Sequence, residues 1–212
     1  MWIKKAPNKL WTPGQTLRIA FLNGTPEFKQ ATIAAAENWL PHVNLKFDFV
    51  DGQAGDIRIL SQEGEFSSRT GTDALLDPDE PSMRLWPHSS AHARYFAANV
   101  MHEFGHMLGA EHEQTNPTCN IPWDISAIYA EHGLDDDPEQ DDYAASVTRT
   151  RLHAWYLDRA DPDNCVYSAY DRKSIMHYVV RQSWTKGDFQ VLLNLDLSEQ
   201  DKAFMASLYP FS

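Results

Sequence analysis

The alternation of apolar and polar residues in the first half of the chain predicts a β-sheet interrupted by helices. Short alternating segments are typical of half-buried strands, and they occur at residues 17–23, 45–50, 56–60 and 82–86. Between the first two of them, residues 27–40 carry apolar side chains at helical spacing, and Pro26 precedes them where its missing N–H costs little. The order strand, helix, strand indicates a crossover unit with parallel pairing.

The second half of the chain is predicted to be mostly helices and loops. A long helix is expected from Ala91 to Leu108, and Gly109 stands where helices commonly end. Shorter helices are expected near residues 124–131 and 144–157, between proline-containing loops. A last helix is predicted after Ser198, because Asp201 follows at the spacing of a capping box. The pattern as a whole indicates the α+β class.

Length and charge narrow the kinds of protein that this chain can be. Its 212 residues fit one domain, or two subdomains that share one cleft. A net charge of −12 argues against a nucleic-acid partner, which would favour a clustered basic patch. No segment approaches the roughly 18 apolar residues of a membrane span. The first residues lack the apolar core of a secretory signal peptide, so we expect no intact signal peptide in this chain.

One segment of the predicted long helix and the turn after it carries the chemistry, and it reads His102-Glu103-Phe104-Gly105-His106-Met107-Leu108-Gly109-Ala110-Glu111-His112. Residues i and i+4 share one face of a helix, so His102 and His106 can bind one metal ion. Gly109 can take a left-handed conformation, which would let His112 return as a third ligand. Three imidazoles with one open position are typical of a catalytic zinc site.

This segment resembles the extended zinc-binding motif of the metzincin clan of metallopeptidases. The segment Ser174-Ile175-Met176-His177-Tyr178 is similar to the clan's Met-turn, in the form found in the astacin family. The resemblance implies a metzincin-like fold: an N-terminal twisted, mostly parallel sheet with two long helices, and a loop-rich C-terminal subdomain with a C-terminal helix. Zinc would lie in the cleft between the two subdomains, which we expect at residues 1–112 and 113–212.

The same resemblance implies a function and a set of site residues. The chain would be a zinc-dependent endopeptidase whose single zinc ion is held by His102, His106 and His112. Glu103 would act as the general base, and Tyr178 would stabilise the oxyanion. A peptide substrate would lie beside an edge strand, for which residues 66–71 are the candidate. The alternatives are a catalytically idle metzincin-like binding module and a zinc hydrolase of a non-peptide substrate.

The resemblance also carries expectations about the chain's beginning and its place of action. In astacins, removal of a pro-segment leaves a new N-terminus buried beside a glutamate that follows the third histidine, and Glu113 occupies that position. No blocking motif precedes Leu17 and Met1 is not a processed end, so the sequence leaves both the pro-segment switch and the buried N-terminus open. We expect a monomer that is secreted or extracellular.

Three smaller signals leave alternatives open. Cys119 and Cys165 are either bridged or two unrelated thiols. Residues 135–142 contain six carboxylates, which favour a solvated loop, with a calcium site as the alternative. Arg181 follows the Met-turn and either lines a substrate pocket for acidic side chains or points to solvent.

Overall fold

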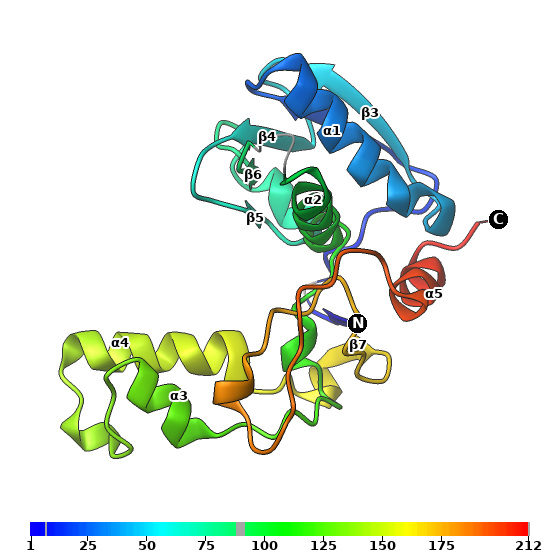
Figure 1. Ribbon diagram of the computed structural model, residues 1–212. Coiled ribbons are helices and arrows are strands. Elements are labelled where there is room, and N and C mark those ends of the chain that lie inside the picture. Colours follow the sequence, from blue (N-terminus) through cyan, green and yellow to red (C-terminus); the bar gives the residue numbers. More distant parts are fainter. Residues whose placement is uncertain (7, 88–91, 212) are drawn as a thin grey trace.

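The computed structural model describes residues 1–6, 8–87 and 92–211, and a five-stranded sheet forms its upper part (Figure 1). The strand order is β3-β2-β4-β6-β5. The strands are β2 (Thr16–Phe21), β3 (Lys46–Asp51), β4 (Ile57–Ser61), β5 (Ser67–Ser68) and β6 (Met83–Leu85). All four strands predicted from the alternation are present, with their ends moved by a few residues.

The pairing of the strands confirms the predicted crossover. β2 pairs in parallel with both β3 and β4, and β4 pairs in parallel with β6. The short strand β5 pairs antiparallel to β6 and forms one edge of the sheet. The candidate edge segment at residues 66–71 therefore does contain the edge strand.

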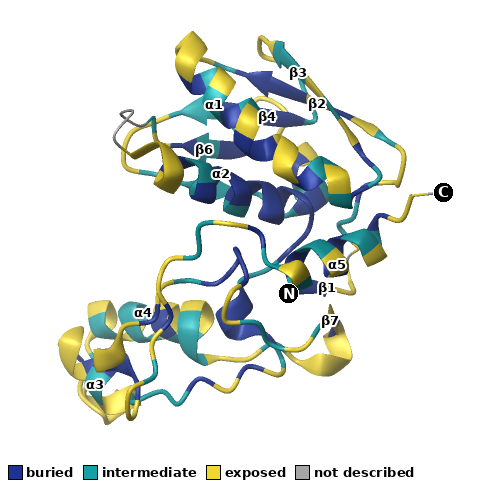
Figure 2. Ribbon diagram, turned by 45° about the vertical axis from the view of Figure 1, so that its right-hand side comes forward, coloured by how far each residue is buried: buried dark blue, intermediate teal, exposed yellow. Residues whose placement is uncertain are grey.

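Two helices, α1 (Pro26–Ala36) and α2 (Ala93–Met107), pack on the same face of this sheet. Aromatic rings make the contact: Phe104 of α2 packs against Phe47 and Phe49, and Phe28 of α1 packs against Phe21. Because alternate residues of a strand share a face, these rings lie on one side of the sheet. The main core therefore fills the layer between sheet and helices, where Figure 2 shows the buried residues concentrated.

The helix ends follow local sequence signals. Thr25 caps α1 by accepting a hydrogen bond from the Phe28 N–H, and Pro26 is the first helical residue, as predicted. The predicted helix to Leu40 continues beyond α1 as a 3-10 helix, Glu37–His42, because Pro41 disfavours a continued α-helix. The predicted start of α2 at Ala91 lies outside the described residues.

The lower part of the molecule contains α3 (Ile125–Glu131) and α4 (Tyr143–Leu152), joined by loops (Figure 1). Asp124 and Asp142 cap these helices through their side chains. The helix predicted to reach residue 157 changes at its end into a π-helical turn, His153–Leu157. Only small apolar clusters pack here, and many residues of α3 and α4 are exposed in Figure 2.

Two terminal elements join the upper and lower parts. The strand β1 (Trp2–Lys4), which was not predicted, pairs antiparallel with β7 (Cys165–Tyr167) in the lower part. The last helix, α5 (Glu199–Leu208), begins at Ser198 with the predicted capping box. It packs against the upper core through Phe204 and Met205. Among the described residues, no helix is long and apolar enough to cross a membrane.

Candidate active site

The helix α2 ends in a turn that brings the residues after it back alongside the helix. Gly109 has a φ of 102°, the left-handed conformation expected for it. The Ala110 N–H then donates to the Gly105 carbonyl at 3.0 Å, and the Glu111 N–H donates to the Trp2 carbonyl at 3.0 Å. The indole N–H of Trp2 also donates to the carbonyl of His112 at 2.8 Å. The turn and the strand β1 together fix the segment that carries the third histidine.

The three histidines of the motif converge on one point. One ring nitrogen from each of His102, His106 and His112 lies within 4.8 Å of the others. Nε2 of His106 is 3.0 Å from Nε2 of His112. Three nitrogens about 2 Å from a tetrahedral zinc ion are separated from one another by roughly 3.3 Å. The spacing of the side chains therefore fits a single metal ion.

Hydrogen bonds orient two of these rings. Nδ1 of His102 lies 2.8 Å from the carbonyl oxygen of Ile175, and Nδ1 of His106 lies 2.8 Å from that of Ala110. A carbonyl oxygen only accepts, so each Nδ1 carries the proton and each Nε2 presents a lone pair. Such contacts are typical of metal-bound histidines, since they fix the ring and its tautomer.

Burial keeps the three imidazoles uncharged. It lowers the pKa of His102 to about 3, and the neighbouring charge of His106 acts in the same direction. It also lowers the pKa of His106 to about 4. The pKa of His112 falls far below its ordinary value, because of burial and of repulsion from the other histidines. Neutral imidazoles are the form that binds a metal ion.

Glu103 lies on the same helix, next to the first histidine of the group. Its side chain is buried, with an exposed fraction of 4% for the residue. Burial raises its pKa to about 8, and the charge of Glu65 near the edge strand acts in the same direction. A carboxylate in this setting takes up a proton readily.

The Met-turn lies directly beneath the helix α2. Met176 is fully buried, and its sulfur would be 2.3 Å from a Cβ atom at Gly105. The glycine inside the motif therefore makes room for the methionine, a contact that no local sequence pattern predicts. Tyr178 follows, with its ring centroid 4.1 Å from that of His112 and 5.9 Å from that of His102. Burial and the charge of Glu103 raise the pKa of Tyr178, so its hydroxyl stays protonated.

A buried carboxylate from the last helix holds the Met-turn. Asp201 accepts hydrogen bonds from the Ser174 hydroxyl at 2.6 Å and from the Ile175 N–H at 2.8 Å. It also accepts the Ser198 N–H at 3.0 Å, which completes the capping box. The sequence signalled only this local role, because the Met-turn lies more than 20 residues earlier in the chain.

The first residue is buried beside Glu113, which answers the question that the sequence left open. The ammonium group of Met1 lies 2.8 Å from the Glu113 carboxylate, and both side chains are fully buried. The ammonium also donates to the Ser168 hydroxyl at 2.7 Å. The carboxylate accepts the Asp171 N–H at 2.8 Å. Pairing of β1 with β7 carries the first residue into this position, and local sequence signals do not predict such long-range pairing.

Gln114 and Tyr156 are two further residues that the sequence analysis missed. Gln114 is fully buried, and its side chain accepts the Tyr178 N–H at 3.1 Å and donates to the Trp155 carbonyl at 2.7 Å. Tyr156 lies on the π-helical turn with its ring centroid 5.7 Å from that of Tyr178. Neither residue belongs to a short motif, so nothing in the sequence marked it.

The structure gives the surroundings of the residues behind the three smaller sequence signals. Cys119 and Cys165 are both buried free thiols, so the unbridged alternative holds. Arg181 is an exposed residue that pairs with Glu131. Within the described part of the chain, the histidine trio is the only group of three or more potential metal-ligating side chains whose ligand atoms converge.

Several carboxylates of the acidic segment already have protein partners. Asp141 forms an ion pair with Arg149 at 2.6 Å. Asp142 accepts the Ala145 N–H at 2.8 Å, and Asp136 accepts the Ser126 hydroxyl at 3.0 Å. These contacts account for part of the segment's acidity without a cation.

Solved structures show which proteins share this architecture. The chain is 29% identical to one structure of myroilysin over the full length of both chains, with a TM-score of 0.87. It is 32% identical to a crystal structure of myroilysin over 97% of this chain and 87% of that chain, with a TM-score of 0.71. Neither a protein-family model nor a curated protein sequence matches the chain.

A more distant structure shares the fold. High choriolytic enzyme 1, a hatching enzyme zinc-protease from Oryzias latipes (medaka fish), is 17% identical over 98% of this chain and 93% of that chain. Its TM-score is 0.57. The likeness to myroilysin over the whole chain and the converging histidines lead to one conclusion: the chain belongs to the astacin-type metzincins and is a zinc-dependent endopeptidase.

Proposed function

We propose that one zinc ion binds to Nε2 of His102, His106 and His112, and that peptide bonds are hydrolysed at this ion. The convergence of the three ring nitrogens within 4.8 Å is the observation that carries the proposal. The contacts of His102 and His106 with backbone carbonyls support it, since they leave the ligating nitrogens free. Zinc bound here would lower the pKa of a water molecule and polarise the scissile carbonyl.

Glu103 is proposed as the general base. It follows His102 on the helix, so its carboxylate lies beside the metal position without belonging to the ligand set. It would accept the proton that the attacking water gives up, and it would deliver that proton to the leaving amine. Burial makes Glu103 more basic than an exposed carboxylate, and the positive charge of a zinc ion bound beside it would favour the ionised form that accepts the proton.

Tyr178 is proposed to stabilise the negative charge that develops on the carbonyl oxygen. Its ring packs against the rings of His102 and His112, and its hydroxyl remains protonated at neutral pH. A phenolic O–H is a good hydrogen-bond donor to an oxyanion. The buried side chain of Gln114 fixes the backbone of Tyr178 and thereby the direction of the phenol.

The substrate is proposed to be a peptide in an extended conformation beside β5. This strand pairs only with β6 within the described sheet, so its outer edge can bind a further strand. We place the cleft between residues 1–112 and residues 113–212, with β1 and α5 crossing from one side to the other. The working unit is proposed to be a monomer.

We also propose that the enzyme works outside the cell that makes it. An endopeptidase that accepts extended segments would attack the unfolded chains of its own cell. Activity in the culture medium, with little in washed cells, is the expected result for a producing strain. Activity confined to the cell lysate would contradict this part of the proposal.

Two substitutions test the division of roles at the site. Glu103→Ala should retain about one zinc ion per chain and lose nearly all turnover, because Glu103 is not a ligand. His106→Ala should lose both metal and activity. Metal content by atomic emission and cleavage of a denatured protein are the measurements. Normal turnover in Glu103→Ala, or full zinc content in His106→Ala, would refute the assignment.

Tyr178→Phe removes only the hydroxyl group, and so it tests whether Tyr178 stabilises the oxyanion. The kcat should fall by roughly 10- to 1000-fold with KM little changed, because the hydroxyl acts only when charge develops. Zinc content should stay the same. A change confined to KM would indicate a substrate-binding role instead.

The two alternatives raised by the sequence find no support. A binding module without activity would be expected to lack one of the four motif residues, and all four are present in the sequence. The solved relatives are peptidases, which argues against a non-peptide substrate. Cleavage of a protein substrate that stops with a chelator and returns with zinc would separate the three possibilities.

A further inference from the structure

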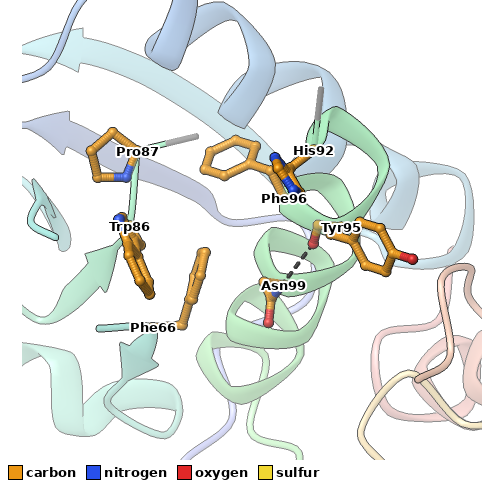
Figure 3. Close-up of a pocket in the computed structure, with 7 residues that line it drawn as sticks. All are labelled: Phe66, Trp86, Pro87, His92, Tyr95, Phe96 and Asn99. Atoms are coloured by element: carbon orange, nitrogen blue, oxygen red, sulfur yellow. Dashed lines mark hydrogen bonds between the residues drawn. The ribbon is translucent and has the colours of Figure 1, made fainter. Parts of the chain in front are cut away.

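A cavity of about 410 Å³ lies along the first half of α2, next to the edge of the sheet (Figure 3). Three of its lining residues come from the sheet side: Phe66 just before β5, and Trp86 and Pro87 just after β6. Three more come from α2: Tyr95, Phe96 and Asn99. The proposed mechanism uses none of them.

The lining is aromatic, and part of it faces solvent. Trp86 is 47% exposed and Tyr95 is 52% exposed, while Phe96 is buried at the base. Phe66 packs against Phe96 with their ring centroids 6.3 Å apart. Single exposed aromatic residues are common, but several that line one hollow of this volume are typical of a binding site.

The cavity and the first two proposed metal ligands share the helix α2. Asn99 lies three residues before His102 on the same helix, and a helix rises about 1.5 Å per residue. Residues 95–99 are therefore roughly 5 to 10 Å from His102 along the helix axis. An extended peptide advances about 3.3 Å per residue, so this distance corresponds to two or three residues. A peptide paired with β5 would pass Phe66, which directly precedes that strand.

We propose that this cavity is a substrate subsite that binds an aromatic or long aliphatic side chain, two or three residues away from the cleaved bond. The inference rests on the proposed function, because it requires a peptide to lie along β5. All but two of the seven lining side chains, the exceptions being His92 and Asn99, offer apolar or aromatic surface, which favours an apolar substrate side chain over a charged one. The enzyme would therefore select substrates by an apolar residue distant from the bond that it cleaves.

The exposed Tyr95 provides a test that should not disturb folding. Tyr95→Glu places a carboxylate at the cavity, and an acidic residue in the first turn of a helix is favourable. Tyr143→Glu is a matched control, since Tyr143 is 87% exposed in the first turn of α4. Trp86→Ala is a second variant, which removes one wall without adding charge.

The measurement is a peptide-library cleavage profile of the zinc-loaded enzymes, followed by kcat/KM on paired peptides. The wild type should prefer Phe, Tyr, Leu or Met at one position two or three residues from the cleaved bond. Tyr95→Glu should lower kcat/KM for the Phe peptide by roughly tenfold, because apolar burial is lost, and change the Ala peptide by less than twofold. Trp86→Ala should weaken the same preference, and Tyr143→Glu should preserve it.

Several results would overturn the subsite. One is a wild-type cleavage profile without an apolar preference two or three residues from the cleaved bond. Another is a Tyr95→Glu profile that agrees with the wild-type profile at every position. If Tyr95→Glu changed the sedimentation coefficient but not the cleavage profile, the cavity would be assigned to contact with a second copy of the chain. Complete absence of cleavage by the zinc-loaded wild type would instead refute the proposed function, so the two failures are distinguishable.

Discussion

The upper and lower parts of this enzyme hold their site residues by different means. In the upper part, one continuous apolar core joins the sheet to α1 and α2. His102 and His106 lie on α2, so their positions follow from the packing of a long helix. In the lower part, the apolar clusters are small, and several buried residues are polar. Hydrogen bonds fix the backbone of the third histidine and of Tyr178, and they hold the Met-turn together with the contacts of Ile175 and Met176 to the main core.

This difference has an energetic consequence. A buried polar residue that loses its partner leaves an unsatisfied group, which costs more than the net gain of the original hydrogen bond. Substitutions of buried polar residues beside the site should therefore be the most damaging changes in the lower part. Each of the following predictions compares such a residue with a matched residue elsewhere.

The largest effect is expected for Glu113. Glu113→Ala leaves the ammonium of Met1 buried without its partner, which should lower the free energy of unfolding by about 3 to 5 kcal/mol. Glu111→Ala is the control, because the ion pair of Glu111 with Lys4 is partly exposed and should contribute less than about 1 kcal/mol. Urea unfolding measures both. Equal losses of unfolding free energy in the two variants would mean that burial does not increase the contribution of the ion pair to stability.

Asp201 comes next. Asp201→Ala leaves three donors without their acceptor, two of them in the Met-turn, and should cost about 2 to 4 kcal/mol. Activity should fall as well, because the floor of the site would shift. Glu199→Ala is the control in the same helical turn, since the Glu199 side chain is 93% exposed. A stable and fully active Asp201→Ala variant would show that the Met-turn needs no support from α5.

Gly105 lies where α2 packs against Met176 of the Met-turn. Its substitution tests whether helix propensity or this packing contact has the larger effect on stability. Helix propensity alone favours Gly105→Ala by about 1 kcal/mol. The new Cβ would lie 2.3 Å from the Met176 sulfur, so we expect a net loss of about 1 to 3 kcal/mol. In a Met176→Ala background the loss should disappear, because the clashing atom is gone. Thermal unfolding of the four chains gives the coupling, and additive effects would contradict the clash.

The sequence predicted those features that depend on local patterns. The strands β2, β3, β4 and β6, the start of α1 and the cap of α5 depend on alternation or on residues a few positions apart. The histidine trio was also predictable, because two members share a helix and Gly109 determines the return of the third. Tyr178 was recognised only through resemblance, since nothing local connects it with His112.

The features that were missed depend on contacts between distant segments. Pairing of β1 with β7 buries Met1, and only the fold brings those strands together. Asp201 showed its capping role in the sequence, but its contacts with the Met-turn require α5 to be in place. Gly105 was visible as a helical glycine, yet the methionine that needs the space lies some 70 residues further along the chain.

The smallest effect is expected from calcium at the acidic residues 135–142. This segment belongs to the lower part. Several of its carboxylates have protein partners, as the contacts of Asp137 with the Glu139 N–H and of Asp141 with Arg149 show. A calcium ion needs six or more oxygen ligands that converge, and it would have to displace these donors. Addition of calcium to the zinc enzyme should therefore move the midpoint of thermal unfolding by less than about 1 °C. Removal of zinc should lower that midpoint by several degrees, because a ligand that binds the folded state stabilises it. A calcium-dependent rise that is abolished by Asp141→Asn and preserved in the exposed control Asp188→Asn would reverse this conclusion and place a cation in the acidic segment.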